Sequence, residues 1–454
     1  TGDDIDVMQT PSIATFNATL GVYELNGSQT WDASKNYILT HPLFVQSPDV
    51  LTIPAGTTIY NTFNDQGTAS KPDDEYGALV ITRGAQIDAQ GTAAEPIVFT
   101  TIRALEAARG TDIDGFDGVG PAPTRGDQGL WGGVVLCGNA KVYNYGGGGL
   151  IGENEIEGFA PGFSPDGDSD GFADVIEYGG SNDADSSGTM RYVSIRHGGY
   201  EFNASGDEVN GLTCGGVGSG TTLEYIEVLS NSDDGIEMFG GTADLRYALV
   251  SFVKDDGFDL DEGYTGRIQY ACVIAMPSSV NDSLGNPIDQ DSDHGGEWDG
   301  NVGGDETDVQ SAPTIANLTL IGDAEGDHAI KFDDYFAGNV YNAVITEFAD
   351  LLDVTGDNAL LDSGSFTTST TDVPNTSGGT LETLLQGQIT SVADVLLNEV
   401  NVGAGTFDPR PQSGSPVATG ATDMSTIDAW FDTTAYQGAF SPTSNWALGW
   451  TGTA

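Results

Sequence analysis

The chain has 454 residues, 38% of them hydrophobic, so it can build a large core, and its 64 glycines follow no collagen period. Its 68 acidic residues stand against 14 lysines and arginines, which gives a formal charge of −54. This charge argues against nucleic acid or an anionic membrane surface as a partner, because both attract basic proteins. No apolar run reaches the roughly 20 residues that cross a bilayer. Self-repulsion on this scale requires screening by salt or bound cations.

Short apolar stretches bounded by Gly, Pro and Asn dominate the N-terminal third and predict stacked β-strands. Residues 1–45 are expected to form an N-terminal cap. The chain begins at Thr1 and shows no signal peptide, as expected for a processed or trimmed form. Segments 51–60, 77–100 and 130–142 are predicted to be successive rungs, whereas the Gly-, Pro- and Asp-rich segments 101–129 and 143–187 are expected to leave the coil as insertions.

The central part of the chain repeats one strand pattern. Its copies begin at apolar anchors separated by 33, 22, 23, 47 and 25 residues, namely Met190, Leu223, Leu245, Ile268, Ile315 and Val340. The corner sequence SDDGIEMFGG at 232–241 recurs 22 residues later as KDDGFDLDEG at 254–263. The short spacings fit one turn of a β-solenoid with rungs ~4.8 Å apart, and the spacing of 47 fits either two turns or one turn that carries an acidic insertion. An all-β parallel β-helix is therefore predicted over 46–360, with a further acidic insertion at 281–308.

The C-terminal part loses this repeat. Residues 361–454 are expected to be rich in loops, with short helix candidates at 380–386 and 391–398. Because an open last rung invites aggregation, the late aromatic residues are expected to cap it; they are Trp430, Tyr436, Phe440, Trp446 and Trp450. The three cysteines, Cys137, Cys214 and Cys272, lie in apolar or glycine-rich strands and are expected to be buried free thiols, with one disulfide as the alternative.

Several long segments resemble a family of secreted bacterial β-helix proteins that is common in marine and Bacteroidetes-type bacteria. They include TIPAGTTI, RGAQIDAQGTAAEPIVFT, WGGVVLCGNAKV, GTMRYVSIRHGGYEF, DDGFDLDEGYTGRIQY and the closing YQGAF and NWALGWT. The resemblance covers most of 45–454 and implies a right-handed parallel β-helix and export to the cell surface or medium. Members are often labelled only as lipoproteins or cell-surface proteins, so the resemblance implies no particular chemistry.

One loop has the complete spacing of a calcium-binding loop of the EF-hand type. Carboxylates occupy positions 1, 3, 5, 9 and 12, a glycine at position 6 permits the sharp turn, and a backbone carbonyl is available at position 7. The expected ligands are Asp166, Asp168, Asp170, Phe172, Asp174 and Glu177. Ca²⁺ is favoured over Mg²⁺ because a flexible shell of oxygens suits the larger ion. The alternative is a solvated acidic loop.

Two further acidic clusters are weaker candidates for Ca²⁺. The first starts with the same alternation but lacks the glycine and the twelfth acid; it consists of Asp289, Asp291, Asp293 and Glu297, with His294 as a minor candidate ligand for a transition metal. The second is formed by the repeated corners, where the 22-residue register would stack like charges; it consists of Asp233, Asp234, Asp255, Asp256, Asp259 and Asp261, next to Glu262. Such stacked acids bind a cation, hold protons or point into water.

The same acids give a weak case for catalysis. Asp233, Asp255, Asp256 and Arg267 are the candidates, since paired carboxylates serve glycosidases and an arginine beside Ca²⁺ serves lyases. Fragments typical of polygalacturonases occur in the wrong order, with Arg196-His197-Gly198 ahead of the acids. Ion pairing is the expected role of the strand arginines, and the four histidines, at positions 41, 197, 294 and 328, are expected to be structural.

The sequence thus predicts a secreted, calcium-binding structural or adhesive β-helix of the cell surface or extracellular matrix. Its expected partners are extracellular glycans or proteins, or further copies of itself in a filament. A carbohydrate-active enzyme and a glycan-binding module without catalysis are the alternatives.

Overall fold

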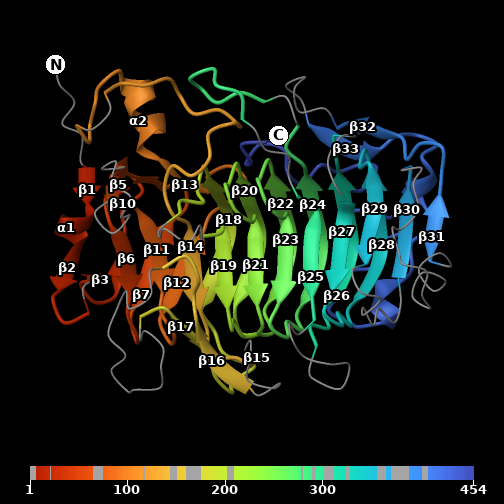
Figure 1. Cartoon of the computed structure of the whole chain (residues 1–454), viewed down its shortest axis with the longest axis horizontal. Coiled ribbons are helices and arrows are strands. Elements are labelled where there is room, and N and C mark those ends of the chain that lie inside the picture. Colours follow the sequence, from red (N-terminus) through yellow and green to blue (C-terminus); the bar gives the residue numbers. More distant parts are fainter. Residues whose placement is uncertain are drawn as a thin grey trace.

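The backbone winds into a right-handed parallel β-helix, which confirms the predicted fold class (Figure 1). The structure is a computed structural model, and it describes residues 7–20, 22–64, 75–115, 118–143, 151–159, 175–201, 209–277, 280–288, 293–300, 310–323, 328–354, 364–369, 388–400 and 407–453. Two long sheets run along the coil. Within the described residues, no helix is both long and apolar enough to span a membrane.

The larger sheet, sheet A, is parallel throughout its described pairings. Its strands are β1 (Val7–Gln9), β4 (Gln29–Thr30), β5 (Asn36–Leu39), β7 (Val50–Pro54), β8 (Thr58–Asn61), β12 (Gln86–Gln90), β13 (Ile97–Thr101), β18 (Gly188–Arg196), β20 (Thr222–Leu229), β22 (Asp244–Ser251), β24 (Arg267–Ile274), β26 (Thr314–Ile321), β28 (Asn339–Thr346), β30 (Gly364–Thr368) and β31 (Ile389–Ser391).

The second sheet, sheet B, is parallel except for its first hairpin, in which β2 pairs antiparallel to β3. Its strands are β2 (Ala14–Asn17), β3 (Val22–Leu25), β6 (Pro42–Val45), β11 (Ala78–Ile81), β14 (Val134–Cys137), β19 (Leu212–Gly215), β21 (Ile236–Phe239), β23 (Phe258–Asp261), β25 (Gly296–Asp299), β27 (His328–Asp333) and β29 (Asp350–Val354).

The remaining elements lie outside these two sheets. They are the strands β9 (Phe63–Asn64), β10 (Glu75–Tyr76), β15 (Val142–Tyr143), β16 (Ile151–Glu155), β17 (Glu177–Gly179), β32 (Leu397–Glu399) and β33 (Asp408–Pro411), the helices α1 (Thr10–Ile13) and α2 (Ile102–Arg109), and the short 3-10 helices at Pro416–Ala418 and Met424–Thr426.

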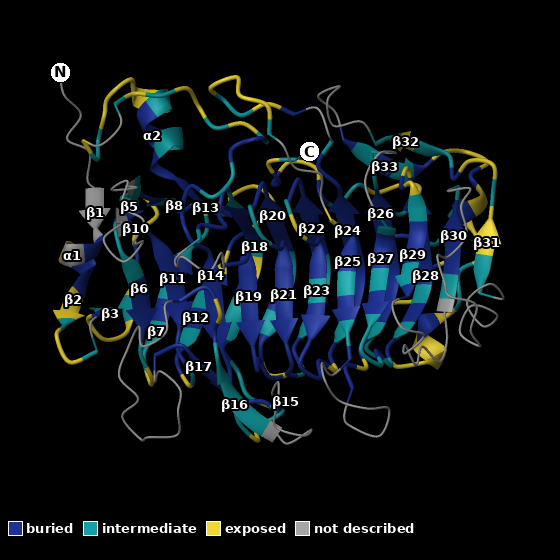
Figure 2. Cartoon of the chain, in the orientation of Figure 1, coloured by how far each residue is buried: buried dark blue, intermediate teal, exposed yellow. Residues whose placement is uncertain are grey.

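A single apolar core fills the coil along its length (Figure 2). Along each strand of sheet B alternate side chains point inward, as in β23, where Phe258 and Leu260 join the core. The intervening residues, Asp259 and Asp261, must therefore point outward. All three cysteines are buried free thiols, as predicted.

Each long strand of sheet A bends at one residue with positive φ. These bends divide the sheet into two segments that run in different directions. The register skips this residue, as between β18 and β20, where Arg191 pairs with Glu224 and Val193 with Ile226. The bending residues are Tyr192, Tyr225, Tyr247, Tyr270, Asn317 and Asn342. Because they recur rung after rung, the four tyrosine rings stack, with centroids 4.2, 4.3 and 4.7 Å apart.

The C-terminal aromatic residues do not cap the last rung, contrary to the prediction. Residues 407–453, here called the C-terminal strap, run along the outer face of sheet A instead. Gly438 N–H donates to the carbonyl of Asn342 in β28, and at the other end Trp450 packs edge-on against Tyr192, 5.4 Å between ring centroids. The physical reason is that the stacked tyrosines present an apolar face, which the strap buries.

Two other predictions about organisation differ from the structure. The coil starts before residue 45, because β5 and β6 already pair in parallel with β8 and β11. Residues 391–398 are not helical, since β31 ends at Ser391 and β32 begins at Leu397, and segment 380–386 lies outside the described residues. Helix α2 was missed; its cap residue Thr101 accepts a hydrogen bond from Arg103 N–H, and Gly110 closes it in the left-handed conformation.

Candidate functional site

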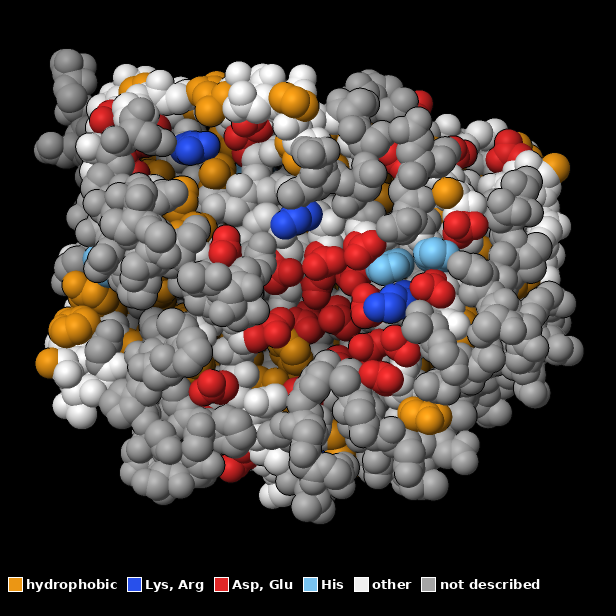
Figure 3. Space-filling view, viewed as in Figure 1, with side chains coloured by type: hydrophobic (Ala, Val, Ile, Leu, Met, Phe, Trp, Pro, Cys, Tyr) orange, Lys and Arg blue, Asp and Glu red, His pale blue; other side chains and the backbone are white. Residues whose placement is uncertain are grey.

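The outer face of sheet B carries acids in register on successive strands. Glu237 in β21 pairs with Asp259 in β23, which in turn pairs with Glu297 in β25. In a second column, the same register places Asp261 of β23 beside Asp299 of β25. Since neighbouring strands lie only ~4.8 Å apart, each carboxylate has another directly above or below it. Figure 3 shows the resulting acidic patch in the middle of this face.

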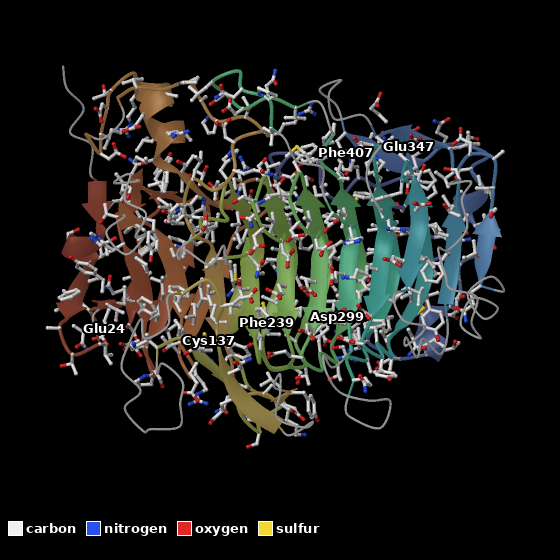
Figure 4. The ribbon with its side chains drawn as sticks, viewed as in Figure 1. Glu24, Cys137, Phe239, Asp299, Glu347 and Phe407 are labelled. Carbon is white, nitrogen blue, oxygen red and sulfur yellow. The ribbon has the colours of Figure 1, made fainter. Side chains whose placement is uncertain are left out.

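These carboxylates line a hollow of about 520 Å³, here called the acidic hollow. Phe239 and Asp299, labelled in Figure 4, belong to strands on either side of β23. The hollow is lined by Asn154, Glu155, Glu157, Tyr178, Glu237, Phe239, Asp259, Asp261, Glu262, Glu297 and Asp299.

The three-stranded sheet β15–β16–β17, which is part of the insertion after residue 143, covers one side of the hollow. Tyr178 OH and Asn154 Nδ2 donate to the two oxygens of Glu262, at 2.9 and 2.6 Å. Tyr178 reaches this position because it packs directly on Gly215 of β19, where any Cβ would lie 2.4 Å from the tyrosine ring. The cover leaves Glu237 3% exposed although it points away from the core.

Burial and mutual repulsion favour the protonated forms of these acids. Burial, and then the neighbouring Asp261, raises the pKa of Asp299 to about 8 and that of Glu262 to about 8. The pKa of Asp259 is raised well above its ordinary value by the same two causes. Burial, and then Glu157 and Asp259, raises the pKa of Glu237 as well. The hollow therefore favours the binding of protons or of cations.

The residues present fit a hard divalent cation. Asp259 Oδ1 and Asp299 Oδ1 are buried acceptor atoms that receive no hydrogen bond from the described residues. A buried acceptor without a donor is costly, and a metal ion bound by oxygen ligands would satisfy both atoms. Carboxylates, with an amide and a phenol nearby, form the oxygen-rich surroundings that Ca²⁺ prefers.

The repeated Asp-Asp corners stack on adjacent rungs, as the 22-residue register predicted. Asp256 N–H donates to Asp234 Oδ1 (2.9 Å), and Asp234 N–H donates to Asn210 Oδ1 (3.2 Å). On the next rung His294 follows, with its Nδ1 2.9 Å from Asp256 Oδ1. Burial raises the pKa of Asp256 to about 7, although the bond to His294 opposes the shift. Asp233 lies with Asp234 and Asp255 in a cluster whose oxygens lie within 4.8 Å of one another.

The predicted calcium loop lies mostly outside the described residues, which exclude 160–174 and with them Asp166, Asp168, Asp170, Phe172 and Asp174. Its twelfth residue, Glu177, is 3% exposed in β17 and forms an ion pair with Arg83 at 2.7 Å. The loop stays a prediction.

The second predicted cluster is also described only in part, since Asp289 and Asp291 lie outside the described residues. The structure places Asp293 and Glu297 around His294.

The structure does not bring Arg267 to the candidate catalytic acids. Arg267 belongs to β24 of sheet A, where it binds Asp244 (2.6 Å) and Asp428 (3.1 Å). Asp255 lies instead at the corner that leads into β23 of sheet B. His197 is likewise occupied elsewhere: its Nδ1 lies 2.7 Å from the Asp127 carbonyl, and burial lowers the pKa of His197 to about 4.

Sequence reasoning missed Glu237, Asp299 and Lys331 as members of this face. Lys331 in β27 pairs with Glu297, Nζ to Oε1 2.5 Å. A signal existed in the repeated corner itself, since aligning GIEMF with GFDLD places Glu237 over Asp259. The long segment between β24, which ends at Ile274, and β25 hides the equivalent alignment of GGEWD at 295–299, which contains Glu297 and Asp299.

Comparison with protein families matches the pectate-lyase-like β-helix domain at residues 22–125 and 119–451. Neither the curated proteins nor the solved structures contain a significant match. The matched ranges cover almost the whole coil and the C-terminal strap. The chain therefore belongs to the family of pectate-lyase-like β-helix domains.

Proposed function

We propose that this protein is a calcium-binding structural or adhesive β-helix of the cell surface or extracellular matrix, and that its acidic hollow holds the ions. The observation that carries the proposal is the in-register stacking of outward acids on β21, β23 and β25, with the buried, unpaired oxygens of Asp259 and Asp299. Bound Ca²⁺ would replace repulsion between rungs by attraction, and would thus stiffen the coil.

The ion would be Ca²⁺ in preference to Mg²⁺. Ca²⁺ accepts six to eight oxygens at 2.3–2.6 Å in irregular geometry, whereas Mg²⁺ requires a near-ideal octahedron. The hollow offers carboxylates from three neighbouring rungs and from the covering insertion. Such a site suits an ion that tolerates irregular, partly bidentate ligands.

Export is part of the proposal, because millimolar Ca²⁺ and salt outside the cell would both relieve a charge of −54. A rigid rod with one charged face would suit adhesion to glycans or proteins. Self-assembly through Ca²⁺ that bridges acidic surfaces of two copies stays a prediction.

Calorimetric titration of Ca²⁺ tests the proposal with the variant Asp259→Asn and the control Asp88→Asn, which removes one charge from an outward position on β12 of sheet A. Asp259→Asn should weaken Ca²⁺ binding at least tenfold, since it removes a buried ligand, and yet raise the melting temperature in chelator, since it also removes repulsion. The control should bind like the wild type. Absence of Ca²⁺ binding by the wild type, or equal binding by Asp259→Asn, would refute the proposal.

A carbohydrate-active enzyme is the second candidate. It is favoured by the raised pKa of Asp299, about 8, beside other carboxylates, because a protonated and an ionised acid together can serve as general acid and base. Assays for new reducing ends and unsaturated products on a panel of polysaccharides, with Asp299→Asn as the inactive control, separate this candidate from a purely structural role.

A further inference from the structure

Three carboxylates converge on one buried imidazole nitrogen at the edge of the acidic hollow. The Nδ1 atom of His294 lies 2.9 Å from Asp256 Oδ1, 3.8 Å from Glu297 Oε2 and 3.9 Å from Asp293 Oδ1. His294 itself is 7% exposed. Figure 3 shows histidine and a basic side chain beside the acidic patch on this face.

A single hydrogen bond does not explain this convergence. An imidazole Nδ1 carries at most one proton, and Asp256 alone satisfies it. The other two oxygens lie beyond hydrogen-bond distance but on the same side of the ring, because Asp293 precedes His294 and Glu297 follows at the start of β25. Their placement gathers three carboxylates around one imidazole nitrogen and therefore favours a positive centre there.

Three of these groups are spaced as ligands of one small transition-metal ion. One ligand atom each of Asp256, His294 and Glu297 lies within 4.8 Å of the other two. Ligand atoms about 2.0–2.1 Å from a tetrahedral Zn²⁺ lie about 3.3 Å from one another. The distances from His294 Nδ1 to Asp256 and Glu297, 2.9 and 3.8 Å, bracket this value, so a metal would need only small shifts of the side chains. Nitrogen among the donors distinguishes this site from the acidic hollow, whose lining acids offer oxygen.

Lys331 adds the feature of an organised site. Its Nζ holds the other oxygen of Glu297, Oε1, at 2.5 Å, which fixes Oε2 toward His294. The three carboxylates and this ammonium sum to −2 when all four are ionised, and that charge matches a divalent ion. The ring of His328 stacks beside His294 at 6.2 Å and lies outside the ligand set.

We propose that Asp256, His294 and Glu297 form a binding site for a divalent transition-metal ion of the zinc type, to which the nearby Asp293 adds negative charge. The ion takes the place of the Nδ1 proton, which is released to solvent. This site shares Glu297 with the lining of the acidic hollow, whereas Asp256 and His294 do not line the hollow.

Titration of the full chain with Co²⁺ in a large excess of Ca²⁺ tests the proposal, because Co²⁺ bound to imidazole and carboxylates absorbs visible light and Zn²⁺ displaces it. The wild type should bind one Co²⁺ per chain and lose the absorption when Zn²⁺ is added. His294→Asn should weaken binding by at least the roughly 10–100-fold that outer-shell partners alone cost. His41→Asn, at the far end of the coil, is the matched control and should bind normally.

Asp293→Asn provides a second variant if His294→Asn fails to fold, since Asp293 is half exposed and outside the core. It should also weaken Co²⁺ binding. Absence of visible absorption in the wild type, or undiminished binding by the variants, overturns the zinc-type site. Because Ca²⁺ binding is measured separately by calorimetry, its loss or retention does not decide this result.

Discussion

At the scale of single residues, Asp259 shows why an outward position on a β-helix can behave like a buried one. It points away from the core, yet Glu237 and Glu297 occupy the same position on the strands before and after it. The covering insertion with Tyr178 lines the same hollow, where Glu237 is only 3% exposed. A carboxylate in this position loses hydration and gains like-charged neighbours, so its ionised form is stable only when a cation binds nearby.

The raised pKa values predict how stability depends on pH without Ca²⁺. Asp256, at about 7, and Asp299 and Glu262, at about 8, hold protons in the folded state that the unfolded chain, with pKa values near 4, has lost. Their contribution is complete below the unfolded pKa and is lost as pH rises through the folded pKa. In chelator, the melting temperature should therefore fall between about pH 6.5 and 8.

This window avoids His197, whose pKa is lowered to about 4 and whose protonation opposes folding only at lower pH. Burial lowers the pKa of His294, but the bond to Asp256 and the charges of Asp256, Asp293 and Glu297 together raise it by more, so this pKa acts in the same direction as those of the acids. Asp299→Asn should flatten the decline. Thermal melts by circular dichroism at several pH values provide the measurement, and a melting temperature that rises across this window would contradict the assignment.

The sequence could predict part of this site from spacing alone. The 22-residue repeat of Asp-Asp-Gly correctly implied that Asp256 stacks on Asp234. It could not show that Glu237 is buried and Asp259 half-buried, because their cover comes from an insertion remote in sequence. The contacts of His294 with Asp256 and of Glu297 with Lys331 were equally inaccessible, since they depend on how the chain re-enters the coil after residue 281.

At the scale of elements, the C-terminal strap is the feature that holds sheet A in place from outside. Gly452 and Thr453 N–H groups donate to the fully buried Glu227 of β20, at 2.8 and 3.0 Å. Trp446 and Trp450 pack edge-on against Tyr225 of the tyrosine stack. The strap thus ties rungs that are far apart along the coil into one unit.

Two variants of the strap separate burial from mere location. Trp450 is 2% exposed, and Trp450→Ala should lower the free energy of unfolding of the protein by about 3–5 kcal/mol, because the contacts with the tyrosine stack disappear. Leu448→Ala, two residues away and 65% exposed, should change it by less than about 0.5 kcal/mol. Urea unfolding curves of both proteins measure the difference, and similar effects of the two changes would show that the strap does not stabilise the coil.

The strap was predicted as a cap because the sequence does not show in which direction the stacked tyrosines point. Tyr recurs at one place in each repeat, in MRYV, LEYI, LRYA and IQYA, so a tyrosine column was visible in the sequence. Its direction was not, because it depends on the positive φ of each tyrosine, from 49 to 64°. That bend turns the rings outward and creates an apolar face, to which the C-terminal aromatics are complementary.

At the scale of the whole molecule, the parallel coil determines where the acidic side chains gather. Its core is continuous and its strands repeat, so the backbone order follows from spacing and alternation, and these were predictable. Parallel stacking also places acidic side chains of successive strands on top of one another. In a chain with charge −54, this concentrates the repulsion between carboxylates along one face. Stability of this face should then depend on divalent cations more than on any single side chain.

Thermal unfolding at pH 8 and constant ionic strength, in Ca²⁺ and in chelator, tests this dependence most directly. A free Ca²⁺ concentration 100-fold above Kd should add about 2.7 kcal/mol per site and raise the melting temperature accordingly. The increase should be smaller in Asp259→Asn, which lacks one ligand of the acidic hollow. Equal melting temperatures of the wild type with and without Ca²⁺ would contradict the account.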